Sequence, residues 1–124
     1  MKRTVVRYKA KPEKVEENQR LIEKVFQELH TKSPGGVRYL ALKLGDGTFV
    51  HFAAVETGDT SITGLQAFRS FRSGINERCI EPPQAGDATI VGNYRMLGEH
   101  DISVMLLAKS LSSLASWARY LTEL

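Results

Sequence analysis

The chain has 124 residues, 42% of them hydrophobic and 25% charged, with a net charge of +3. These values are typical of a globular domain and exclude a disordered or fibrous chain. The single cysteine, Cys79, excludes an internal disulfide framework. No apolar stretch is as long as that of a signal peptide or a membrane span. We therefore expect a cytoplasmic protein without a membrane partner.

The first half of the chain predicts a strand, a helix and a hairpin. Residues 4–10 read as a strand, and a helix follows between Pro12 and Pro34, because apolar residues recur there at helical spacing. Strands are predicted over 37–44 and 48–56, joined by a Gly-Asp-Gly link that is typical of a hairpin turn.

The second half predicts a helix, a strand and a tail. Apolar spacings of three and four favour a helix over 63–79, ended by Pro82-Pro83 because proline disfavours a helical residue before it. A fourth strand is expected over 88–97. The resulting β-α-β-β-α-β order predicts an α+β, ferredoxin-like fold with a four-stranded antiparallel sheet as a domain over 1–97. Residues 98–124 are then a linker and a C-terminal helix that docks on its own domain or on a partner subunit.

Both faces of the predicted hairpin are apolar. An antiparallel sheet with one face in water should alternate apolar and polar residues. Strand 37–44 instead carries Tyr39 and Ala41 on one side and Leu40 and Leu42 on the other. A second copy of the same sheet is the simplest cover for the second face, so we predict a homodimer.

Two stretches carry a family resemblance. Together with the order of elements, the hairpin GVRYLALKLGDGTFVHFAAVE and the closing stretch LQAFRSFRSGINERCIEPP resemble the dimeric α/β-barrel superfamily, and within it the antibiotic-biosynthesis-monooxygenase-like domain. The resemblance covers about residues 3–97. It implies that two sheets pack into a barrel and that each subunit keeps a pocket between its sheet and its helices. It also implies cofactor-independent monooxygenase activity on planar aromatic or quinol-like substrates.

The haem-degrading branch of that superfamily is disfavoured. The resemblance would require an Asn on the first strand and a Trp and a His near the second helix, whereas TVVRYKA has no Asn and the predicted second helix has neither Trp nor His. Three dispersed histidines and one cysteine show no metal-ligand spacing. We therefore expect no cofactor and no metal.

The candidate catalytic residue is His51, because an imidazole with a pKa near 6.5 suits removal of a phenolic proton. The alternative is a histidine that hydrogen-bonds across the sheet or the dimer interface, and the sequence leaves open which sheet face it occupies. The candidate substrate-binding residues are Tyr8, Tyr39, Phe68, Arg72 and Tyr94. Phenols and a guanidinium can hold an aromatic ligand or its anion, although buried tyrosines also fill cores.

Two other functions stay open on the sequence. One is a non-catalytic dimer that binds a small apolar ligand. The other is an RNA-binding module, since residues 49–52 (Phe-Val-His-Phe) match the end of an RNA-recognition motif. The preceding Gly-Asp-Gly-Thr lacks the basic and aromatic residues of that motif, and the basic residues beyond the N-terminus are scattered, so nucleic acid is disfavoured as a partner.

Overall fold

The computed structural model describes residues 1–97. The chain forms two compact units, Met1–Thr89 and a second that begins at Ile90. In chain order the elements are β1 (Lys2–Ala10), the 3-10 helix η1 (Pro12–Lys14), α1 (Val15–Lys32), β2 (Val37–Lys43), β3 (Thr48–Val55), α2 (Gln66–Arg72), α3 (Ile75–Arg78) and β4 (Cys79–Asp87). The C-terminal helix expected within 98–124 lies outside the described residues, and the boundary at 97 stays a prediction.

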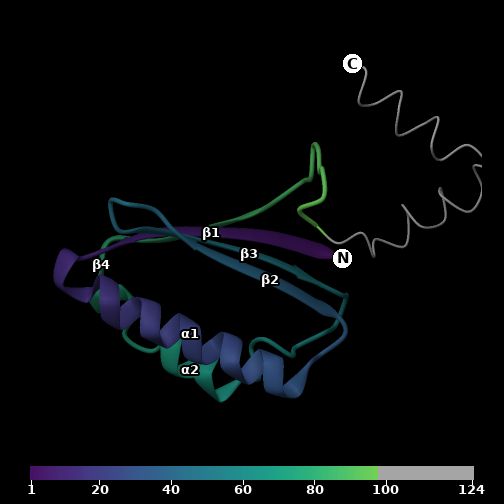
Figure 1. Cartoon of the computed structure of the whole chain (residues 1–124), viewed down its shortest axis with the longest axis horizontal. Coiled ribbons are helices and arrows are strands. Elements are labelled where there is room, and N and C mark those ends of the chain that lie inside the picture. The colour runs from purple at the N-terminus through teal and green to yellow at the C-terminus, as the bar shows by residue number, and fades with distance from the viewer. Residues whose placement is uncertain (98–124) are drawn as a thin grey trace, which may run out of the picture. The chain divides into compact units, whose positions relative to one another are not determined.

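One antiparallel sheet of four strands carries the first unit. Its order is β2-β3-β1-β4, so β1 and β3 are central and β2 and β4 are the edges. Figure 1 shows α1 and α2 side by side against the same face of this sheet. The arrangement confirms the predicted α+β, ferredoxin-like fold.

The long helix α1 has clear start and stop signals. Pro12 lies in the preceding 3-10 turn, and Glu16 and Glu17 occupy the first helical turn, where carboxylates complement the helix dipole. At the other end Ser33 takes a left-handed φ of 48°, and its N–H donates to Leu29 O. The helix therefore presents one buried face, which includes Ile22 and Val25, to the sheet.

The core lies between this sheet face and the helices. Tyr8 of β1 and Phe49 of β3 are both 2% exposed and stack with ring centroids 5.5 Å apart, and Val25 and Leu65 are equally buried. Because strand residues alternate between faces, His51 shares the face of Phe49 and is 5% exposed. His51 therefore lies beneath the helices, which the sequence left open.

The predicted second helix is broken. Instead of one helix over 63–79, α2 ends at Arg72 and the short α3 begins after Gly74, whose φ of 75° is left-handed. A residue in that conformation cannot continue an α-helix. Cys79, expected at the end of the helix, is the first residue of β4.

The predicted fourth strand over 88–97 is wrong. The strand that pairs with β1 is β4, and it contains Pro82 and Pro83, which were expected to terminate structure rather than to join a sheet. An edge strand tolerates proline, and here the register of pairing shifts between Arg7 and Lys9, opposite the prolines. The segment from Ala88 to Leu97 contains neither helix nor strand.

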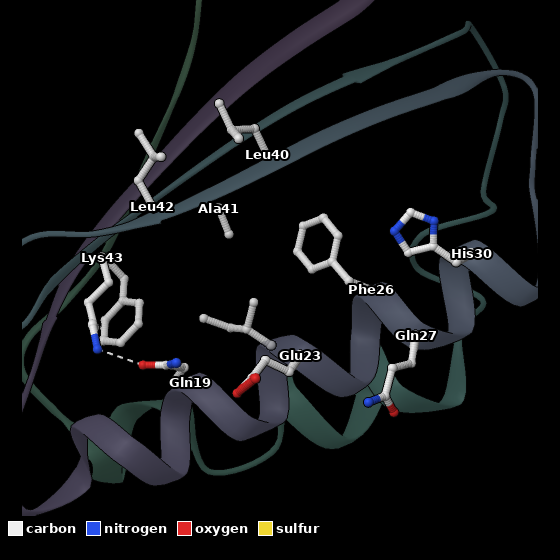
Figure 2. A pocket seen from close by; sticks show the side chains of 11 residues that line it. Gln19, Glu23, Phe26, Gln27, His30, Leu40, Ala41, Leu42 and Lys43 are labelled. Atoms are coloured by element: carbon white, nitrogen blue, oxygen red, sulfur yellow. Dashed lines mark hydrogen bonds between the residues drawn. The ribbon is translucent and has the colours of Figure 1, made fainter.

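The sheet face opposite the helices carries exposed apolar side chains. Leu40 is 42% exposed and Leu42 is 52% exposed. Figure 2 shows Leu40 and Leu42 on one side of β2 and Ala41 on the other, toward α1. On β2 the alternation supports the sequence-based expectation that the second face is apolar as well.

Candidate functional site

A cavity of about 440 Å³ opens between the helix-covered face of the sheet and α2. Its walls come from β1, β2, β3, the loop that follows β3, α2, α3 and β4. Of the residues expected at a site, the cavity brings together Tyr8, Tyr39, His51, Phe68 and Arg72. Most of the remaining wall is aliphatic or aromatic, which suits an apolar ligand.

Tyr94 lies elsewhere in the chain. It was expected on a fourth strand of the sheet, but it belongs to the second unit, where its side chain is 69% exposed. The guanidinium of Arg95 lies over its ring, 5.0 Å from the centroid. A role for Tyr94 in ligand binding stays a prediction.

His51 is held on both sides of its ring by tyrosines. Tyr8 Oη lies 2.9 Å from His51 Nε2, and Tyr39 Oη lies 2.7 Å from His51 Nδ1. The ring of Phe71 packs on it with centroids 5.4 Å apart. Neither ring nitrogen is free to take a proton directly from a ligand while these two bonds are in place.

Two buried polar side chains extend this set away from the cavity. Asn18 Nδ2 donates to Tyr8 Oη at 2.8 Å, and Arg78 Nε donates to Asn18 Oδ1 at 3.1 Å. Asn18 is fully buried and Arg78 is 5% exposed. The side chains of Arg78, Asn18, Tyr8, His51 and Tyr39 thus form one continuous chain of hydrogen bonds, which we call the relay.

Burial keeps the members of the relay that contact the cavity uncharged. It lowers the pKa of His51 to about 4, and it raises the pKa of Tyr39 to about 12. Burial also raises the pKa of Tyr8 above its ordinary value, against an opposing effect of the Asn18 hydrogen bond. At neutral pH the imidazole and both phenols are therefore neutral hydrogen-bonding groups.

Charges lie at the margin of the cavity. Arg72 is exposed, and Asp59, in the loop after β3, is half-buried. Hydrogen bonds from Ser61, whose N–H lies 2.7 Å from Asp59 Oδ1, lower the pKa of that carboxyl. The cavity therefore combines a neutral, mostly apolar interior with a cation and an anion at its wall.

Asn18 and Arg78 were missed by the sequence-based site. Asn18 follows Val15 by three residues and precedes Ile22 by four, so it sits on the buried stripe of α1. A polar side chain on such a stripe is a usable signal, because buried polar groups need partners. Arg78 precedes Cys79 in a segment that was expected to be a helix. Its hydrogen-bond partners depend on the break of that helix at Gly74, which the sequence analysis did not predict.

A second hollow, of about 510 Å³, lies between α1 and the edge strand β2 (Figure 2). Phe26 and Ala41 point into it from the helix and the strand. At its rim Lys43 Nζ donates to Gln19 Oε1 at 2.6 Å. It holds no counterpart of the relay, so the cavity at His51 is the better candidate site.

Within residues 1–97, no three side chains of His, Cys, Asp or Glu come together in a way that could hold a metal ion. Across the same residues, none of the helices has the length and apolarity needed to cross a membrane.

No protein-family model and no curated protein matches the sequence. Solved structures do match by fold. A candidate antibiotic biosynthesis monooxygenase from Nitrosomonas europaea gives a TM-score of 0.60 at 17% identity, over 73% of this chain and 89% of that one. A protein of unknown function from the same organism gives 0.58 at 21% identity, over 78% and 96%.

The third comparison is SnoaB, a cofactor-independent oxygenase from Streptomyces nogalater. It gives a TM-score of 0.55 at 15% identity, over 76% of this chain and 96% of that one. At these identities the likeness is one of fold. The chain therefore has the fold of antibiotic-biosynthesis-monooxygenase-like proteins, which confirms the resemblance at that level.

Proposed function

We propose that the chain binds a planar aromatic or quinol-like molecule in the cavity at His51 and oxidises it as a cofactor-independent monooxygenase. The observation that carries the proposal is the cavity itself, which combines aromatic and aliphatic walls with a neutral hydrogen-bonding pair, His51 and Tyr39, and a cation, Arg72. An apolar cavity with a few convergent polar groups is the usual form of a small-molecule site.

The chemistry asks little of the protein. In the proposed reaction a phenol loses its hydroxyl hydrogen and the hydrogen of another ring carbon, that carbon gains one oxygen atom from O₂ to give a quinone, and the second oxygen atom leaves as water. The substrate supplies all four electrons that reduce O₂, so the reaction needs no external reductant. The protein would stabilise the substrate anion that reacts with O₂, which is electrostatic catalysis by positioned donors and charges.

Individual roles follow from the contacts. Tyr39 and Arg72 would hold the anionic oxygen, so that the phenolic proton is released to solvent as the anion forms. Phe68 would pack on the ring plane. His51, expected as the base, would act as a positioning residue, because both of its ring nitrogens already contact tyrosine hydroxyls.

A non-catalytic ligand-binding protein is the second candidate. One observation favours it: within residues 1–97, His51 is the histidine that lines this cavity, and burial lowers its pKa to about 4, so the cavity offers no free imidazole base. RNA binding gains less support, because Phe49 is 2% exposed beneath the helices and cannot stack on a base.

A homodimer is part of the proposal. Leu40 and Leu42 give the β2 side of the uncovered sheet face an apolar character that a monomer would leave in water. A second copy packed on that face would bury these side chains and leave the cavity, on the opposite face of the sheet, in each subunit.

The first test is a thermal-shift panel followed by oxygen uptake. The panel contains naphthoquinols, polycyclic phenols, flavin, haem and a short single-stranded RNA. A ligand at about 100 times its dissociation constant stabilises by roughly 2.7 kcal/mol, a shift of several degrees. Uptake of O₂ with a phenol that also shifts the melting temperature supports the enzyme, and a shift without uptake supports the non-catalytic protein.

A pair of variants identifies which hollow is used. Ala53→Leu places a larger side chain in the cavity at His51, whereas Ala41→Leu places a larger side chain in the hollow beside α1. We expect phenol binding to be lost in Ala53→Leu and kept in Ala41→Leu. The reverse pattern would move the site to the other hollow, and a shift with RNA alone would overturn the small-molecule proposal.

A further inference from the structure

We infer that the relay is directional, that it leaves Tyr39 as an obligatory hydrogen-bond donor into the cavity, and that the ligand therefore presents an acceptor oxygen, a carbonyl or an anionic oxygen, to Tyr39. The part of this inference that concerns the ligand rests on the proposed binding role of the cavity. The direction of the relay stands on the hydrogen-bond partners alone.

The direction originates at Arg78. A guanidinium has N–H donors and no acceptor, so every hydrogen bond it makes points away from it. Its Nη1 donates to Ser73 O at 3.0 Å, its Nη2 donates to Phe71 O, and its Nε donates to Asn18 Oδ1 at 3.1 Å. The two carbonyl contacts fix the guanidinium, so the third N–H has one orientation.

Arg78 in turn fixes the amide of Asn18. Because Oδ1 must face the guanidinium, Nδ2 faces Tyr8, and an amide nitrogen can only donate. Tyr8 Oη therefore accepts at 2.8 Å and must place its own proton on another acceptor. Tyr8 is 2% exposed, so that proton goes to its remaining partner, His51 Nε2, at 2.9 Å.

The imidazole of His51 determines the direction of the next hydrogen bond, to Tyr39. With Nε2 as an acceptor, a neutral His51 carries its proton on Nδ1, and Nδ1–H donates to Tyr39 Oη at 2.7 Å. Within residues 1–97 His51 is the one side-chain partner of the Tyr39 hydroxyl. The hydroxyl of Tyr39 receives this bond and keeps its own proton for a group in the cavity, whose wall it forms.

This arrangement selects the ligand by its oxygen. A carbonyl or an anionic oxygen beside Tyr39 completes the relay, whereas a C–H edge at the same place leaves the last proton without a partner. The donated bonds upstream polarise the Tyr39 hydroxyl, which makes it a stronger donor than an isolated phenol. The surrounding aromatic wall, with Phe68 and Phe71, suits a flat ring that bears this oxygen.

The tautomer of His51 tests the direction without any ligand. Long-range ¹H–¹⁵N spectra of the full chain, with the His51 signals identified by their loss in His51→Gln, distinguish the two neutral tautomers. We expect the proton on Nδ1. A proton on Nε2 in the wild-type protein would overturn the inference.

Asn18→Asp is designed to reverse the relay. The new carboxylate has almost the same shape, pairs with Arg78 and can only accept, so the Tyr8 proton would turn toward it. His51 Nε2 would then donate to Tyr8, and Nδ1 would accept from Tyr39. We expect the tautomer to switch. A folded variant with the wild-type tautomer contradicts the inference, and if the variant does not fold, the wild-type spectrum decides.

A pair of probes tests the ligand class. Binding of 9-fluorenone, which has an acceptor oxygen, and of fluorene, which lacks it, is measured with wild type, with Tyr39→Phe and with the control Thr31→Val, which removes an exposed hydroxyl of α1 outside the cavity. We expect Tyr39→Phe to weaken fluorenone binding roughly tenfold and to leave fluorene binding unchanged. Equal fluorenone binding by wild type and Tyr39→Phe would overturn the inference. If neither probe binds the wild type, the proposed function fails, and the ligand class with it, while the tautomer still decides the direction.

Discussion

Tyr39 Oη lies 2.7 Å from His51 Nδ1, and this contact joins β2, an edge of the sheet, to the buried centre of β3. This contact, together with the Tyr8 hydroxyl at the other ring nitrogen, explains why an otherwise apolar strand contains a histidine. Both partners are neutral groups, so nothing in the contact compensates a charge on the ring. Protonation of His51 must therefore oppose folding.

The first prediction concerns acid stability. Burial lowers the pKa of His51 from 6.5 to about 4 in the folded chain, so the unfolded chain binds the extra proton between these values. Stability is then lost as the pH falls through this window. Between about pH 7.5 and about pH 4.5 we expect His51 to remove about 2 to 3 kcal/mol from the free energy of unfolding, measured by urea denaturation.

His51→Gln is the control for this effect. The variant lacks the titrating ring, so its loss of stability over the same pH interval should be smaller by that amount. Carboxyl groups with lowered pKa, such as Asp46 and Asp59, titrate in both proteins and cancel in the comparison. Equal losses in wild type and variant would contradict the buried neutral imidazole.

The second prediction concerns the amide at the centre of the relay. Asn18→Leu removes the acceptor of Arg78 Nε and the donor to Tyr8 Oη, and both partners are buried. We expect the free energy of unfolding to fall by about 2 to 4 kcal/mol, because each unsatisfied buried group costs more than a hydrogen bond contributes. Gln19→Leu, at the adjacent position with an exposed bond to Lys43, should change it by less than about 0.5 kcal/mol.

The third prediction concerns the hairpin turn. Gly47 has a left-handed φ of 86°, and a Cβ there would lie 3.3 Å from Val15 Cγ2. Gly47→Ala should therefore destabilise the fold by about 1 to 2 kcal/mol. Gly45, in the same turn, has no neighbour within 4 Å of a Cβ, so Gly45→Ala should have almost no effect on the urea midpoint. Similar costs for the two substitutions would show that the turn differs from this description.

The fourth prediction concerns assembly. If two sheets pack through the face opposite the helices, Leu42→Lys places a charge in that interface and should yield a monomer. Arg20→Glu, on the exposed side of α1, should keep the assembly state of the wild type. Light scattering at micromolar concentration measures the masses, and a monomeric wild type would refute the homodimer.

Much of the fold follows from sequence patterns. The spacing in α1 and the Gly-Asp-Gly hairpin act locally, so the first strand, the helix and the two following strands appear where they were predicted. The fourth strand was misplaced because Pro82 and Pro83 were weighed as local breakers, while the sheet uses them at an edge with a shifted register. Edge position is a property of the whole sheet and has no local signature.

The candidate site was likewise predicted from the sequence only in part. Residue type and strand position were enough to single out His51, Tyr8 and Tyr39, because polar aromatic groups in apolar strands need partners. Which groups become those partners depends on contacts between distant segments. Asn18 meets Arg78 across 60 positions of sequence, and this pairing decides the orientation of every group between Arg78 and the cavity.

The prolines of β4 have a consequence for unwanted association. Pro82 and Pro83 have no backbone N–H, so this stretch of the edge strand β4 lacks two successive hydrogen-bond donors. An outer edge with a gap in its row of donors is a poor template for another strand. At the β4 end the sheet is thus protected against edge-to-edge growth into an aggregate, while its apolar face stays available to a partner.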